Sequence, residues 1–154
     1  MIHAPVLGET FAAARGQGAR LNGAPIRVTT RQDLRTGLIG IGANDRVPAA
    51  RVGEMLAALT EAGASWTRYG SGALMLAWVA AGRLVAYAEP RMSAWDCMAG
   101  YCLVEAAGGR VLRFPDGDDL IRPAPVLGAR PGVYDEVLAL TRLDDDAVWG
   151  SRRR

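Results

Sequence analysis

Two carboxylates and a glycine-rich turn are the residues of this chain best placed to do chemistry. Gly70-Ser71-Gly72 stands directly before an apolar segment, Glu89 follows a run of small and apolar residues, and Asp96 begins another apolar segment. Backbone N–H groups at a glycine-rich helix start are free to bind an anion. Carboxylates would repel that anion unless a cation lies between them or unless they bind hydroxyl groups of a polyol. Magnesium suits such a site, because it accepts a few carboxylates together with waters and phosphate oxygens.

Each of these residues also has a purely structural interpretation, which the pattern alone favours. Gly70-Ser71-Gly72 is typical of a tight turn with a serine cap, Asp96 of a helix cap, and Glu89 of an exposed strand end. We expect Trp95 to anchor the core. Glu105 lies on an otherwise apolar helix, where we expect a partly buried, paired carboxylate.

Strands alternate with helices along the chain, which indicates an α/β fold. We expect one domain over residues 1–143 and a disordered tail over residues 144–154. The predicted strands cover residues 10–14, 19–21, 26–28, 38–42, 66–69, 84–88, 110–114 and 126–129. The predicted helices cover residues 48–62, 73–81, 96–107 and 133–142.

The composition excludes several classes of protein. All 18 basic residues are arginine, which excludes a P-loop and a Schiff-base enzyme. The basic residues are scattered and the net charge is only +2, so we expect no nucleic-acid partner. No apolar run approaches the roughly 20 residues that span a bilayer. We therefore expect no membrane partner and a cytoplasmic protein.

Cysteine and histidine usage excludes further kinds of site. Cys97 and Cys102 fall on one predicted helix with side chains pointing in different directions, so we expect no disulfide and a reducing compartment. With His3 as the sole histidine, a closed zinc site is not available. A Ser-His-Asp triad would have to use that histidine at the extreme N-terminus, so we do not expect serine-hydrolase chemistry.

Four stretches of the chain match the motifs of a known family in their order. Residues 8–23 look like a hairpin, residues 68–73 like a G-[ST]-[AG] loop, residues 79–90 like the segment that follows it, and residues 95–109 like a C-terminal signature. In this order they resemble the inositol monophosphatase family, the magnesium-dependent phosphomonoesterases. The resemblance is clear from about Ile2 to Phe114 and looser beyond.

The resemblance implies a fold and a set of roles. The fold would be a mixed sheet with flanking helices, like the C-terminal part of the family's layered α/β fold. Gly70, Ser71 and Gly72 would line the substrate. Glu89 would bind a hydroxyl of inositol or a similar polyol, and Asp96 would both bind Mg²⁺ and contact substrate. In the family, bound metal ions activate a water for attack on the phosphomonoester.

The chain also departs from the family. It contains neither the glutamate-rich helix nor the Asp-Pro-x-Asp-Gly-Thr loop that supply most of the metal ligands. We therefore expect no complete catalytic set in this chain and little or no activity from it alone. Its expected partners are a small phosphorylated polyol and either a missing N-terminal half or a second copy.

Two functions remain open on this basis. The first is a magnesium-dependent phosphatase, truncated here, that hydrolyses inositol monophosphate or a similar small phosphomonoester. The alternative is a non-catalytic module that binds a sugar phosphate or a partner chain through the loop at Gly70.

Overall fold

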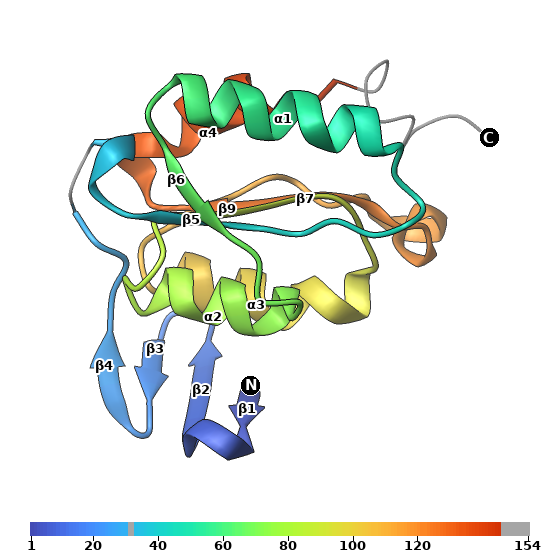
Figure 1. Ribbon diagram of the computed structural model, residues 1–154. Coiled ribbons are helices and arrows are strands. Elements are labelled where there is room, and N and C mark those ends of the chain that lie inside the picture. The colour runs from blue at the N-terminus through green and yellow to red at the C-terminus, as the bar shows by residue number, and fades with distance from the viewer. Residues whose placement is uncertain (31–32, 146–154) are drawn as a thin grey trace.

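The computed structural model describes residues 1–30 and 33–145. Two sheets and two helix pairs alternate in four layers (Figure 1). The helices are α1 (Ala49–Glu61), α2 (Gly72–Ala80), α3 (Ala94–Ala106) and α4 (Pro131–Thr141), with short 3-10 helices η1 (Pro5–Leu7), η2 (Leu34–Thr36) and η3 (Gly117–Ile121). The strands are β1 (Ile2–Ala4), β2 (Glu9–Ala14), β3 (Gly18–Leu21), β4 (Ala24–Ile26), β5 (Leu38–Ile41), β6 (Ser65–Thr67), β7 (Ala86–Met92), β8 (Arg110–Val111) and β9 (Ala124–Ala129).

The first sheet is an antiparallel meander in the order β1-β2-β3-β4. Phe11 pairs with Ile2 on one side and with Leu21 on the other, which puts apolar side chains on one face. The turn between β3 and β4 uses Asn22 and Gly23, both with positive φ, as a short hairpin turn requires. The face that carries Phe11 packs on α3.

The second sheet is mixed, in the order β6-β5-β7-β9-β8. β5 runs parallel to both β6 and β7, whereas β9 is antiparallel to β7 and β8. The helices α1 and α4 cover one face, and α2 and α3 cover the other (Figure 1). The expected mixed sheet with flanking helices is confirmed.

Two apolar cores hold these layers together. One lies around α2 and α3 between the two sheets and includes Phe11, Leu76 and Val104. The other lies beneath α1 and α4 and includes Ile39, Leu59 and Val137. The pair α2–α3 is therefore buried on both sides, which explains why both helices are apolar on several faces.

Five strands differ from the sequence prediction by two residues or more, and β1 was not predicted. β9 begins at Ala124 instead of residue 126. β4 ends at Ile26, because the chain then leaves the sheet and Val28 N–H donates to the Ala107 carbonyl at the end of α3 (3.1 Å). β6 ends at Thr67 instead of residue 69. β8 covers two residues, since Phe114 turns into the core between the sheets.

The fifth of these strands is β7, which was predicted over residues 84–88 and runs from Ala86 to Met92. It begins later because Leu84 N–H donates to the Trp78 carbonyl and so helps to close α2 (3.3 Å). It continues through Glu89, which the sequence had placed at the strand end, and its pairing with β9 shifts register between Glu89 and Met92.

Three predictions about α3 were wrong. Ser93 occupies the cap position, and Asp96 is the third residue of the helix. Trp95, expected in the core, is 73% exposed, and Glu105 is exposed with no ion pair among the residues described. The buried face follows Ala94, Cys97, Tyr101 and Val104, so residues one position further along turn about 100° away from the core.

Both cysteines are free thiols, as predicted. Cys97 is buried, and this burial raises the pKa of its thiol to about 12. Of the predicted tail, residues 146–154 lie outside the described residues.

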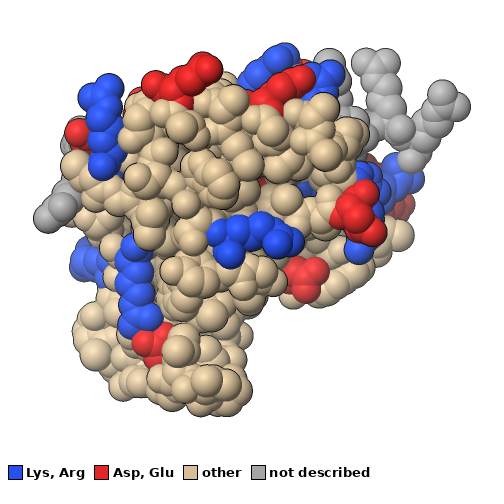
Figure 2. Space-filling model, viewed as in Figure 1, with Lys and Arg blue, Asp and Glu red and all other residues tan. Residues whose placement is uncertain are grey.

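Charge is unevenly spread over the face in Figure 2. Arginine and acidic side chains are mixed over the helical layers, while the lower part, which holds the four-stranded sheet, is almost uncharged. Within the described ranges, none of the helices is long and apolar enough to cross a bilayer.

The contact between α2 and α3 yields a prediction. A Cβ at Gly100 would lie 2.5 Å from the Cβ of Leu76, an atom that moves only if a helix moves. Gly100→Ala should therefore lower the free energy of unfolding by about 1–3 kcal/mol in chemical denaturation. Gly53→Ala is the matched control, because a Cβ at that position of α1 meets nothing within 4 Å. It should be neutral or stabilising by up to about 1 kcal/mol. Equal stability of the two variants would contradict the close helix contact.

Candidate functional site

A cavity of about 340 Å³ opens where the N-termini of α2 and α3 meet the end of β7. All five residues that the sequence singled out line it: Gly70, Ser71, Gly72, Glu89 and Asp96. Six further residues complete the wall: Asn44, Arg46, Ala73, Arg91, Met92 and Ser93. The fold thus brings together a helix start and two carboxylates that are separated by up to 26 residues in sequence.

The N-terminus of α2 forms one wall. Gly70 has φ +79°, a backbone conformation that residues other than glycine rarely adopt. Ser71 is the N-cap, and its Oγ accepts a hydrogen bond from Leu74 N–H (3.4 Å). This cap occupies Leu74 N–H, whereas the N–H groups of Gly72 and Ala73 have no partner within the helix. They are therefore available to an anion in the cavity.

Gly72 permits a close approach between the helix start and β7. A Cβ at this position would lie 2.7 Å from the hydroxyl of Tyr87 and would also meet the side chain of Met92. Only glycine therefore lets the first turn of α2 come so near to β7. Tyr87 itself is fully buried and is not among the residues that line this cavity.

Glu89 is half-buried on β7 and held by two hydrogen bonds. The hydroxyl of Tyr87 donates to its Oε2, and Nδ2 of Asn44 donates to its Oε1 (3.4 Å). Burial raises the pKa of Glu89 above its ordinary value, and the nearby charge of Asp96 raises it further, against the lowering effect of the two donors. Burial likewise raises the pKa of Tyr87, so its hydroxyl stays protonated.

Asp96 is exposed in the first turn of α3, where a negative charge is favoured by the helix dipole. In the part of the chain that the structure describes, its carboxylate forms no ion pair. Both oxygens of Glu89, in contrast, already accept hydrogen bonds. Asp96 is thus the carboxylate in this cavity that is best able to bind a cation.

The donor set fits a magnesium ion only in part. Among residues 1–30 and 33–145, no three His, Cys, Asp or Glu side chains gather as a metal site. Magnesium can be held by one or two carboxylates when waters and substrate phosphate complete its six ligands. Asp96 fits the role of one such ligand, with Glu89 nearby, and a pair of metal ions would need further ligands.

Several polar residues around Glu89 were not predicted from the sequence as site residues. Asn44 and Arg46 belong to the loop after β5, where the sequence predicted neither a strand nor a helix, and Arg91 follows a proline in β7. Tyr87 looked like one more apolar strand residue. Their joint presence depends on the pairing of β5 with β7, which no local pattern reveals.

The sequence and its comparisons give the family. The model of the inositol monophosphatase family matches residues 1–144. The chain is 34% identical over 140 residues to a protein of Haemophilus influenzae named Nus factor SuhB, covering 90% of this chain and 52% of that protein. A protein of the same name from Pseudomonas aeruginosa is 35% identical over 138 residues, with 87% and 51% covered.

Solved structures agree with this result. The extragenic suppressor protein suhB of Bartonella henselae superposes with a TM-score of 0.81 at 29% identity, over 90% of this chain and 54% of that one. An IMPase of Thermotoga maritima gives 0.79 at 28% identity over 95% and 56%. SuhB of Mycobacterium tuberculosis gives 0.75 at 36% identity over 88% and 55%.

The chain spans about half the length of the relatives it matches. The match nevertheless covers nearly all of its own residues and includes the helix starts and the strand that line the cavity. The chain therefore belongs to the inositol monophosphatase family.

Proposed function

We propose that this chain supplies the substrate-binding part, and one metal ligand, of a magnesium-dependent phosphatase acting on inositol monophosphate or a similar small phosphorylated polyol. The observation that carries the proposal is the meeting of an anion-binding helix start with Glu89 and Asp96 in one cavity. Family membership supports a phosphatase, and a solved structure of one relative, inositol monophosphatase II of Staphylococcus aureus, contains bound inositol monophosphate.

Each wall of the cavity has a role in this proposal. The N–H groups at the start of α2 bind the phosphate, with Gly70, Ser71 and Gly72 shaping the approach. Glu89, fixed by Tyr87 and Asn44, accepts hydrogen bonds from polyol hydroxyls. Asp96 holds Mg²⁺, which when bound polarises the phosphoester and favours ionisation of a water.

Hydrolysis needs more than these residues. Since the chain supplies so few carboxylates, the remaining metal ligands would come from a partner, either an N-terminal half or a second copy of the chain. The free thiols support a reducing, cytoplasmic setting. The bound ligand in every case is a small phosphorylated polyol, without nucleic acid or membrane.

Asp96→Asn tests the proposed metal ligand. Calorimetric titration of the 154-residue chain with inositol 1-phosphate should show affinity rising about tenfold or more when Mg²⁺ is added. The variant should lose this gain, because a neutral amide binds Mg²⁺ far more weakly than a carboxylate does. Asp118→Asn, an exposed acidic residue of η3, is the matched control and should behave like the parent.

The outcomes separate the two functions. A magnesium-dependent gain that survives in Asp96→Asn would refute the assignment of this ligand. Tight binding that never responds to Mg²⁺ would favour the alternative, a non-catalytic module that binds a sugar phosphate.

The raised pKa of Glu89 makes a second prediction, on stability. From its ordinary value of 4.5 up to its raised folded value, the native carboxyl keeps its proton while the unfolded one has lost it. The free energy of unfolding therefore falls as pH rises through this window, because the native state binds more protons. Glu89→Gln stays neutral and should not show this part of the decline.

Urea denaturation at several values between about pH 4 and 7 measures the effect. The stability of Glu89→Gln relative to the parent should increase with pH across the range. Glu61→Gln, at the exposed end of α1, is the matched control. A difference between parent and Glu89→Gln that does not vary with pH would show that Glu89 has no perturbed ionisation.

A further inference from the structure

Two arginines line the cavity without a carboxylate partner among residues 1–30 and 33–145. Arg46 and Arg91 are both exposed and both belong to the wall. Within the described residues, neither forms an ion pair, although Glu89 and Asp96 line the same cavity. The cavity therefore carries positive side-chain charge that its own carboxylates do not neutralise by contact.

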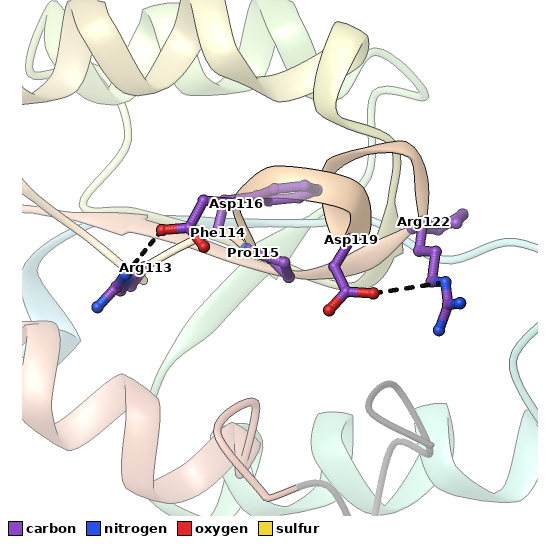
Figure 3. A pocket seen from close by; sticks show the side chains of 7 residues that line it. Arg113, Phe114, Pro115, Asp116, Asp119 and Arg122 are labelled. Carbon is purple, nitrogen blue, oxygen red and sulfur yellow. Dashed lines mark hydrogen bonds and ion pairs between the residues drawn. The ribbon is translucent and has the colours of Figure 1, made fainter. Parts of the chain in front are cut away.

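A second cavity of the molecule provides a contrast. It is lined by Arg113, Phe114, Pro115, Asp116, Asp119, Arg122 and Pro123 (Figure 3). There each arginine has an acidic partner: Arg113 pairs with Asp116 at 2.8 Å, and Arg122 with Asp119 at 3.5 Å. Its charge is balanced within the chain, so it offers much less to an anionic ligand.

The backbone that carries the two arginines is fixed by one side chain. Oδ1 of Asn44 accepts a hydrogen bond from Arg46 N–H (3.1 Å), and Nδ2 of Asn44 donates to the Arg91 carbonyl (2.8 Å). Arg68 holds the same loop by donating to the Ala43 carbonyl (3.0 Å). Two segments 45 residues apart are thus tied together, and their arginines flank one amide.

We infer that Arg46 and Arg91 form a second anion subsite, so that the preferred ligand is a polyol carrying two phosphates. The inference rests on the proposed function, since the start of α2 and Asp96 provide the first phosphate site. A planar guanidinium matches a phosphate through two parallel hydrogen bonds. The cavity of about 340 Å³ falls in the usual range for small ligands.

A matched pair of ligands tests the inference. Inositol 1-phosphate and inositol 1,4-bisphosphate share one polyol and differ by one phosphate. Both are titrated calorimetrically into the 154-residue chain in the same Mg²⁺ buffer at fixed ionic strength, because charge interactions depend on salt. The bisphosphate should bind about tenfold more tightly, as expected for one or two charge-assisted hydrogen bonds.

The arginine variants identify the subsite. Arg46→Gln and Arg91→Gln should each reduce the affinity ratio of the two ligands to about threefold or less, and the double variant should bring it to about one. Arg113→Gln, in the cavity of Figure 3, should leave the ratio unchanged. This control removes the same charge at a distance and so measures non-specific attraction.

Three results would overturn the inference. Equal affinity for the two ligands would exclude a second anion subsite and leave the proposed function standing. The affinity ratio of the two ligands could also fall as much in Arg113→Gln as in Arg46→Gln. The preference for the bisphosphate would then come from the overall charge of the chain and not from a subsite. Failure of the chain to bind either ligand would remove the inference together with the proposed function.

Discussion

The site depends on the close contact between α2 and α3, which lie side by side between the two sheets. Gly100 leaves room for Leu76, so the two helices approach closely. The chain passes from α2 back through β7 and then into α3, so the two helices run in the same direction. Both of their N-termini therefore line one cavity. The partial positive charges of the two helix ends therefore add at one place. Asp96, in the first turn of α3, offsets part of that charge while leaving a carboxylate available to a cation.

Residues with a local signature could be predicted from the sequence. Gly70 and Ser71 indicate a turn and a helix cap, since these preferences act within a few residues. Asp96 indicated a helix start only approximately, because Ser93 is the cap and Asp96 lies in the first turn. Whether these residues bind substrate stays a prediction, although they do line one cavity. For a helix that is apolar on several faces, the sequence does not show which face packs against the core. Trp95 and Glu105 each follow a residue of the buried face of α3. The sequence pattern alone did not show which positions of this helix face the core and which face solvent.

Residues that meet only through the sheet were beyond sequence reasoning. Asn44 contacts Glu89 and Arg91 because β5 and β7 are neighbours, although Asn44 lies 45 residues before Glu89 and 47 before Arg91 in the chain. The hydroxyl of Tyr87 points at Glu89 because both lie on the same face of one strand. Burial in the folded chain raises the pKa of Glu89, and these two donors lower it in part, so the electrostatic state of Glu89 depends on the tertiary structure.

Pro90 explains both an error of prediction and a feature of the site. Proline cannot donate to a strand ladder, so it favours the end of a strand or a bulge. Here β7 is a central strand and continues, and its pairing with β9 shifts register across Pro90. A bulge of this kind re-aims the side chains beside it. Pro90 and Met92 stay buried while Arg91 is exposed at the cavity, and Asn44 takes up the Arg91 carbonyl. The same local disruption that made the strand end hard to predict therefore places at the cavity one of the two arginines that form no ion pair among the described residues.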